Sequence, residues 1–315
     1  SLHFLEFSNK WTTWHKRKLF SEHLIILKGK DYKVTIFPII HFSKGKEMEN
    51  AVNTFNNTRG FIIEGDIGKF VSFFSSFAEN QAIFPNYLDA KIRKTKVVLG
   101  QGYARDFKTT GFDYAMASGY FGINPAKNFV VQFGHSKHFI GDGYRSLLLS
   151  DNAFNYPFLR IQTSFWKMQY TNLYVEMQDI NYFENNGIDD YDQMGYAKKY
   201  MSSHYLSTNL NSKLNIGIFE SVIWEVNHTP ESRGFDINYL NPIALFLPLG
   251  YSINSPDNAL VGINAKYKLP LKSHLYGQLI LDEFSLNEMK GNNDWYGSKY
   301  GYQVGAKMYD VVGLD

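Results

Sequence analysis

The sequence predicts an all-β fold, an antiparallel transmembrane β-barrel with short periplasmic turns and long extracellular loops. From Tyr32 onward, apolar and polar residues alternate in roughly twelve segments of about ten residues, the length of a tilted strand that crosses a bilayer. Short turns and long loops alternate between these segments. Aromatic residues make up 17% of the chain, an excess that suits strands and membrane interfaces. Together these observations favour a barrel over a soluble sandwich.

The composition excludes several classes of protein. The formal net charge is only +2, so we expect no nucleic-acid partner. The chain has no cysteine, which removes disulfide scaffolds, thiol catalysis and cysteine metal sites. The longest apolar run, 242–251, is interrupted by Pro248, so we expect no membrane-spanning helix. Because the chain begins at Ser1 without a signal sequence, we interpret it as a processed or trimmed piece.

The expected organisation is a short leading segment followed by one barrel. Residues 11–24 show helical spacing of Trp and Leu against a basic face, which predicts a short helix within a lead segment 1–31. The barrel is predicted over 32–315. The expected tight turns are 68–69, 125–127, 166–167, 211–213 and 270–272, and the expected long loops are 80–114, 135–157, 178–203, 225–257 and 285–299. We therefore expect the short turns at one end of the barrel and the long loops at the other.

Two segments near the C-terminus have clear faces. In 259–269 an apolar set alternates with a polar set that includes Asn264, Lys266 and Lys268, and 300–309 alternates in the same way. The apolar set is expected to face lipid and the polar set the lumen. Glu220 falls on the apolar face of its own segment, so either a bulge changes the register there or that end stands outside the bilayer.

The rest of the chain is organised around the stretch 134–170. Glycines at Gly141 and Gly143 predict a sharp turn at positive φ around Asp142. A second structural turn is predicted at Ser150, Asp151 and Asn152. The loop also carries several Leu, Phe and Tyr side chains, too many for a solvated loop. We therefore expect it to pack inward over the lumen.

Several long motifs carry a resemblance to a known family. They are HFIGDGYRSLLLSDNA at 138–153, YPFLRIQTSFWKMQYTN at 156–172, KYMSSHYLS at 199–207, LNIGIFESVIW at 214–224, RGFDINYLNPI at 233–243 and YGQLILDEFSL at 276–286. In this order they resemble the RemB family of gliding motility proteins of Bacteroidetes, which is in turn similar to the Wzi-like capsule-assembly barrels. The resemblance implies an outer-membrane barrel that engages surface polysaccharide or assists cell-surface movement. Members of that family continue past the position of Asp315, so further C-terminal strands are expected.

Positive side chains are the candidate glycan-binding residues. Arg160, Lys266, Lys268 and Lys307 are predicted on the lumen side, with Arg145 and Arg233 in the loops, and the sugar face of a ligand is expected to stack on tyrosines such as Tyr144. The alternative is that these cations pair with Asp142, Asp151, Asp236 and Asp282 and hold the loops inside a polar barrel. Both roles are expected among these residues.

Two other kinds of site were weighed. His135 and His138 with Asp142 are potential metal ligands, but no further ligand set follows at a defined spacing, which favours a loop hydrogen-bond network. Asp282 and Glu283 are adjacent on a strand and point to opposite faces, so they cannot form a glycosidase pair. We therefore predict no catalytic residues, no metal and no cofactor.

The predicted function is an outer-membrane barrel that binds or anchors surface or capsular polysaccharide and supports gliding motility. Its expected surroundings are outer-membrane lipid and, as further partners, the proteins of the motility or secretion machinery. The alternative function is a structural or partner-binding component of that machinery without glycan binding.

Overall fold

The chain folds into antiparallel β-structure within two compact units, residues Ser1–Asn124 and Pro125–Asp315. The computed structural model describes residue 13 and residues 23–49, 51–180, 196–226, 234–242, 257–282 and 299–310. The predicted helix at 11–24 lies almost wholly outside these residues, as does Arg233. In the predicted lead segment, residues Ile25–Lys28 form a strand, β1, paired with β2.

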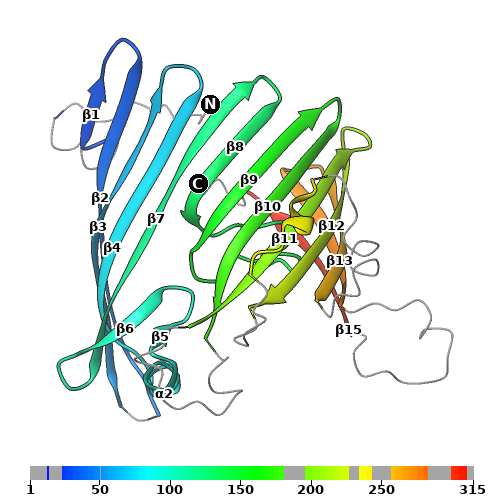
Figure 1. Cartoon of the computed structure of the whole chain (residues 1–315). Helices are drawn as coiled ribbons and strands as arrows, with labels where there is room; N and C mark the ends of the chain where they lie inside the picture. Colours follow the sequence, from blue (N-terminus) through cyan, green and yellow to red (C-terminus); the bar gives the residue numbers. More distant parts are fainter. Residues whose placement is uncertain are drawn as a thin grey trace, which may run out of the picture. The chain divides into compact units, whose positions relative to one another are not determined.

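The first unit is a meander of five strands with an insertion. The order is β1, β2 (Tyr32–Lys46), β3 (Asn53–Ile67), β4 (Val71–Ile83) and β7 (Gly111–Ala126). Between β4 and β7 the chain forms α2 (Asn86–Thr95), β5 (Val97–Val98) and β6 (Gly102–Phe107), and β6 pairs with both β5 and β7 (Figure 1).

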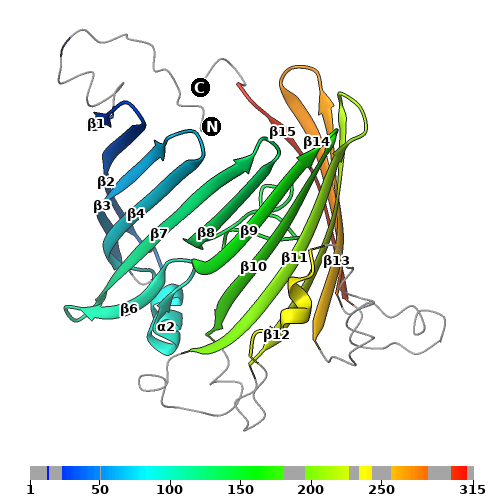
Figure 2. The same cartoon turned by 45° about the horizontal axis from the view of Figure 1, so that its top comes forward.

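The second unit is a meander in which each strand pairs with the next along the chain. Its strands are β8 (Phe129–Ser136), β9 (Tyr156–Phe165), β10 (Met168–Asp179), β11 (Ala197–Asn209), β12 (Leu214–Glu225), β13 (Asn258–Leu269), β14 (Ser273–Asp282) and β15 (Lys299–Met308). A single 3-10 turn, η1 (Ile237–Leu240), lies between β12 and β13. Figure 2 shows the short turns after β9, β11 and β13 together at one end of the strands.

The predicted all-β, antiparallel fold class is confirmed. The twelve strands β2–β4 and β7–β15 have eight or more residues each, which matches the expected number of segments. The turns at 166–167 and 270–272 lie where predicted. The turn predicted at 125–127 is shifted to 127–128, because β7 continues through Pro125. The ladder with β4 ends one residue earlier, at Asn124, whose N–H donates to Phe70 O at 2.8 Å, so Pro125 lies beyond its last hydrogen bond.

The long connection predicted at 80–114 spans 84–110 in the structure and contains α2, β5 and β6. This connection folds on itself, because Ile92 of α2 packs on Val98, Ala104 and Phe112 in a buried apolar cluster. α2 ends at Lys96, whose backbone adopts a left-handed conformation and whose N–H donates to Ile92 O. No helix in the described part of the chain is long and apolar enough to cross a membrane.

The strands of the second unit have one apolar, exposed face and one polar face. The register places Ile263 of β13 beside Ile218 of β12 and Leu279 of β14, and all three side chains are exposed. Asn264 and Lys266 point to the opposite face, as predicted. The exposed apolar set comprises Phe133, Phe165, Ile218, Ile263, Tyr267, Leu269, Leu275, Leu279, Tyr302, Val304 and Met308.

The structure excludes a bulge as the explanation for Glu220. The ladder from β11 through β13 runs past Glu220 without a bulge, so this residue does lie on the apolar face. At that end of the strands the face is covered by the segment 234–242. Ser202 Oγ donates to Tyr239 O at 2.7 Å, and Tyr239 packs on Val222 and Trp224. Protein therefore covers this end of the apolar face.

Candidate functional site

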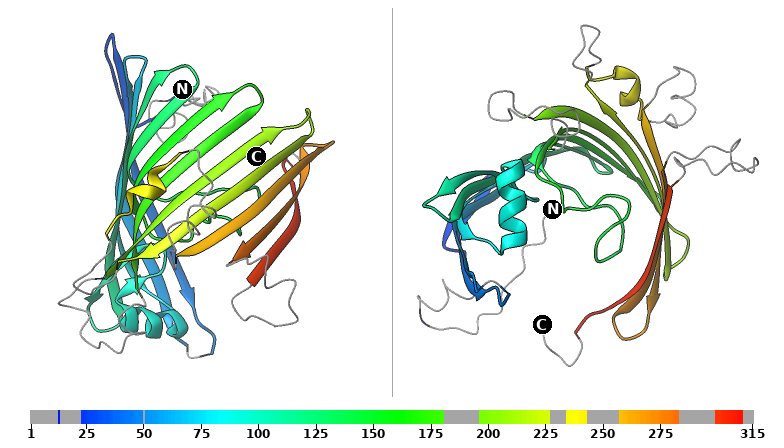
Figure 3. Two further views of the ribbon diagram at one scale, coloured as in Figure 1. Left: turned by 45° about the vertical axis from the view of Figure 1, so that its right-hand side comes forward. Right: turned by 90° about the horizontal axis from the view of Figure 1, so that it is seen from below.

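The site is built on the segment 137–155, which joins β8 to β9. Figure 3 shows this segment on the concave side of the strands of the second unit. Ile140 and Leu149 form a β-bridge that closes its inner part, and Ile140 and Leu148 pack on Phe219 of β12. The loop therefore packs inward on the polar face, as predicted, because Ile140 and Leu148 are buried there, although Tyr144 and Phe154 are exposed.

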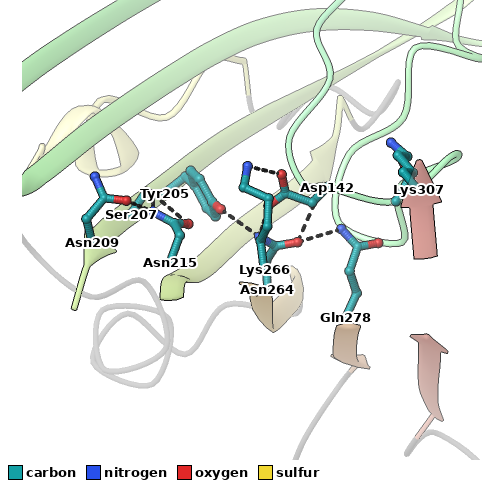
Figure 4. A network of polar contacts seen from close by, with 10 residues as sticks. Asp142, Tyr205, Ser207, Asn209, Asn215, Asn264, Lys266, Gln278 and Lys307 are labelled. Carbon is teal, nitrogen blue, oxygen red and sulfur yellow. Dashed lines mark hydrogen bonds and ion pairs between the residues drawn. The ribbon is translucent and has the colours of Figure 1, made fainter. Parts of the chain in front are cut away.

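Asp142 fixes the tip of this loop to β13. Its carboxylate accepts hydrogen bonds from Lys266 Nζ and from Asn264 Nδ2, the latter at 2.7 Å, and its backbone N–H donates to Asn264 Oδ1 at 3.1 Å. Gln278 of β14 also donates to Asn264 Oδ1, and Asn264 Nδ2 reaches the hydroxyl of Tyr205 (Figure 4). The fully buried Asn264 amide is thus satisfied at both ends, which makes it the centre of the attachment.

The two glycines beside Asp142 both lack room for a side chain, and one of them also needs its backbone angle. Gly141 has φ +124°, where L residues are disfavoured, so the positive φ predicted for it is confirmed, and a Cβ there would lie 2.0 Å from Gln278 Nε2. The same prediction for Gly143 is wrong, because its φ is not in the left-handed region. A Cβ at Gly143 would instead lie 2.2 Å from Gln303 Oε1. Lys307 also donates to Gly143 O at 3.1 Å, so this cation holds the loop.

A cavity of about 560 Å³ opens between this loop and strands β9 to β13. Its volume is in the range of small-molecule sites. Its wall contains five cations, Lys137, Arg160, Lys213, Lys266 and Lys268, and one carboxylate, Asp142. The cavity therefore carries a large excess of positive charge.

The cations of the cavity differ in how they are held. Arg160 donates to Gln132 Oε1 at 3.0 Å and to Gln162 Oε1, which fixes its guanidinium on the polar face. Lys266 is paired with Asp142. Lys213 and Lys268 have no carboxylate partner among the described residues. These two ammonium groups are available to an anion from solution.

A row of amides and hydroxyls continues the same wall. The register aligns Asn209 of β11 with Asn215 of β12 and Lys266 of β13. Asn215 Nδ2 donates to both Asn209 Oδ1 and Ser207 Oγ at 3.0 Å (Figure 4). Neutral donors and acceptors of this kind can bind sugar hydroxyls beside a charged group.

The structure brings together some of the predicted residues and separates others. Arg160, Lys266 and Lys268 line one cavity, whereas Arg145 and Tyr144 are exposed and lie outside its lining. Sequence reasoning missed Lys137, Lys213, Tyr205 and the amides. The signal for Lys213 was its place in a short turn next to a predicted lumen face. The predicted turn residues Asp151 and Asn152 do form an exposed turn, and Ser150 precedes it.

Among the described residues, the alternative pairing of loop carboxylates with cations is present at Asp142, which pairs with Lys266. Asp236 caps η1 by accepting from Asn238 N at 2.9 Å. Asp282 stands opposite Lys299 in the register. These acids therefore do not form one set that neutralises the cavity.

The environment of His138 is that of a packed side chain. Its ring lies edge-on to Phe158, with centroids 4.3 Å apart, and stacks on Tyr156. Burial, with the nearby positive charge of Arg160, lowers the pKa of His138 to about 4. No group of three or more His, Asp or Glu residues that could hold a metal is present in the described ranges.

Comparisons with known proteins give only distant likenesses. No family model and no curated protein matches the chain. A solved structure of Salmonella typhi OmpF in complex with daunomycin aligns with a TM-score of 0.36 and 9% identity, over 90% of this chain and 88% of that one. The copper transporter OprC aligns with a TM-score of 0.33 and 12% identity, over 81% of this chain and 42% of that one. At these TM-scores the likeness supports no inference about binding or transport.

Proposed function

We propose that this protein is an outer-membrane barrel that binds an acidic surface polysaccharide in the cavity under the 137–155 loop. The observation that carries the proposal is the excess of five cations over one carboxylate in the cavity wall. The resemblance to the RemB family adds capsule assembly and gliding motility as the proposed cellular setting. We propose a binding role without catalysis.

The proposed membrane location rests on the outer face of the strands. Apolar side chains such as Ile263, Leu275 and Val304 are exposed there in adjacent strands, and a soluble protein rarely exposes so continuous an apolar surface. The alternation of short turns and long connections is the arrangement of outer-membrane barrels. The protein should therefore partition with outer membranes and need detergent, and recovery of a folded, detergent-free monomer would contradict the location.

The polysaccharide class follows from the two kinds of side chain in the cavity. The ammonium groups of Lys213 and Lys268 offer charge to a carboxylate or similar group on a sugar. The amides of Asn209 and Asn215 lie beside them and match the hydroxyls of the same sugar. A polymer with one acidic group per few sugars fits this pairing better than a neutral glycan.

The test is binding of alginate, a polymer of uronic acids, to the detergent-solubilised full chain, with neutral dextran as the comparison polymer. Replacing Lys213 and Lys268 together by Gln should weaken alginate binding about tenfold and leave the fold intact, because neither lysine forms an ion pair with a residue in the described ranges. Binding of alginate should also weaken as salt is raised. The matched control is Arg145→Gln with Lys127→Gln, which removes the same charge outside the cavity and should bind as the parent does.

Three outcomes would count against the proposal. The first is that the parent binds dextran as well as alginate. The second is that the control variant loses as much alginate binding as the variant with Lys213 and Lys268 replaced. The third is that the parent does not bind alginate. In the last case the partner-binding alternative becomes the better account, and co-purification from native membranes tests it.

A further inference from the structure

The short turns combine a large exposed apolar side chain with an adjacent lysine. Trp166 and Lys167 join β9 to β10, and Leu271 and Lys272 join β13 to β14. In the first unit, Lys69 and Phe70 join β3 to β4 in the same way. Trp166 is 89% exposed, Leu271 83% and Phe70 60%. The same pairing of residue types thus recurs in separate hairpins.

Two of these apolar residues stand in a backbone conformation that disfavours them. The φ angles are +53° at Trp166 and +58° at Leu271, and Lys272 follows at +49°. Hairpin turns with positive φ normally use Gly, Asn or Asp, since other residues are strained there. Trp166 and Leu271 are held in strained turns while almost fully exposed, so they stabilise nothing within the described chain. Their use points to a partner outside the chain.

The turn tips continue the apolar outer face of the strands. Phe165 precedes Trp166, and Leu269 lies two residues before Leu271, and both are exposed. The lysines add positive charge at the edge of this face. Lys69 and Lys167 have no carboxylate partner in the part of the chain that the structure describes, and Lys272 pairs with Asp310 across an exposed surface. An apolar face with a cationic edge matches the boundary of a lipid bilayer.

We propose that each of these turns binds anionic phospholipid headgroups in the leaflet that it faces. Trp166, Leu271 and Phe70 lie at the boundary between headgroups and acyl chains, where amphipathic and apolar side chains anchor membrane proteins. The neighbouring lysines bind the lipid phosphates. This inference rests on the membrane location proposed above, and it does not depend on polysaccharide binding.

The test measures which lipid stays with the purified protein. The full chain is equilibrated in detergent with equal amounts of phosphatidylglycerol and phosphatidylcholine, repurified, and its retained lipid is analysed. We expect phosphatidylglycerol to be enriched about fivefold over phosphatidylcholine. Each lysine near an anionic surface strengthens binding by a factor of about five, and we expect the bound lipid to contact one lysine on average. The variant Lys69→Gln, Lys167→Gln, Lys272→Gln should retain the two lipids nearly equally.

The matched control removes three lysines from the opposite ends of strands in the first unit. Lys44, Lys46 and Lys108 are also exposed, so their replacement by Gln makes the same change in net charge. This control should keep the enrichment. A second readout is quenching of tryptophan fluorescence by lipid brominated near the headgroup, which should drop in Trp166→Phe.

Equal retention of both lipids by the parent would overturn the inference, as would an equal loss of enrichment in the control. The same experiment separates this inference from the proposed membrane location. A chain that stays folded without detergent contradicts the location itself. A chain that needs detergent but shows no lipid preference contradicts only the role of the turns.

Discussion

Two long connections, 84–110 in the first unit and 137–155 in the second, are held in place by different chemistry. The first forms α2 and the β5–β6 pair and buries its own apolar cluster around Ile92. The second forms only the bridge between Ile140 and Leu149. It is attached to the strands by an apolar contact of Ile140 and Leu148 with Phe219 and, in addition, by buried polar groups around Asn264.

The difference separates a connection that is stabilised by packing from one whose polar attachment lies beside a candidate binding site. Apolar burial is insensitive to charge, so the stability of the 84–110 connection should depend mainly on packing. The 137–155 loop depends on hydrogen-bond donors and acceptors that must all have partners. A buried polar network loses much of its stabilising free energy when one member is replaced. In return, its attachment leaves a polar, cation-rich cavity beside it. We therefore expect the first connection to respond to changes of volume and the second to changes of charge.

The largest expected effect is loss of the apolar cluster in the first unit. Ile92 is 2% exposed, and Ile92→Ala should destabilise the docking of α2 by about 2–5 kcal/mol through lost transfer energy and the cavity left behind. Trypsin should then cleave faster at the Lys and Arg residues of α2. Tyr87→Ala, at a position 71% exposed on the same helix, should cleave as the parent does. Equal cleavage of the Ile92 variant would show that the cluster does not hold the helix.

A fall in pH should open the second connection and leave the first unchanged. The pKa of His138 is lowered to about 4 from a usual 6.5, so its neutral form is favoured in the folded loop. Stability is therefore complete above pH 6.5 and falls as the pH drops toward 4, by at most about 3 kcal/mol. The measurement is amide hydrogen exchange at Ile140, corrected for intrinsic exchange at each pH. His138→Phe should flatten this dependence, and an unchanged profile would exclude His138 as its cause.

Much of the fold could be predicted from the sequence, because the faces of a strand and the positions of turns depend on residues that are close together in the sequence. The alternation at 259–269 identified the polar face that carries Asn264 and Lys266, and the turn at 166–167 was placed correctly. α2 could not be predicted in the same way. A helix of ten residues is marginal by itself, and its stability comes from contacts of Ile92 with strands that follow later in the chain.

The cavity was less predictable than the fold. Its cations come from one loop, one turn and two strands, and only the pairing register brings Lys213 and Lys268 to one wall. No local spacing in the sequence indicates that these two lysines lie on the same wall. Gly143 shows the same limit in part, because the need for glycine there comes from Arg145 O nearby and from Gln303, 160 residues later in the chain, and not from its own backbone angle.

The two glycines of the loop offer a sharper test of this point. Gly141→Ala and Gly143→Ala should each destabilise the loop by about 1–3 kcal/mol, measured by hydrogen exchange at Ile140. Adding Gln303→Ala should relieve part of the loss in Gly143→Ala, because the contact at 2.2 Å is with the end of that side chain. The same addition should not rescue Gly141→Ala, whose strain lies in its φ angle and in the contact of its Cβ with Gln278 Nε2 at 2.0 Å. Rescue of both variants would contradict the distinction.

The smallest effect is expected from a matched pair of carboxylates, one in each connection. Asp89 of α2 pairs with Arg93 at 2.7 Å on the surface and raises the pKa of that guanidinium. Exposed pairs of this kind contribute little, so Asp89→Asn should cost less than about 0.5 kcal/mol. Asp142→Asn should cost about 1–3 kcal/mol, because an amide must turn its NH₂ group toward either Lys266 Nζ or Asn264 Nδ2, and both are donors.

Asn264 cannot flip its amide to accommodate that change, since its Oδ1 already accepts from Asp142 N and from Gln278 Nε2. The comparison is read from hydrogen exchange in α2 for one variant and at Ile140 for the other. Because the two substitutions are chemically the same, only the surroundings of the carboxylate differ. Equal losses in the two variants would show that the loop over the cavity is held by packing, as α2 is, and that the polar network around Asn264 adds little.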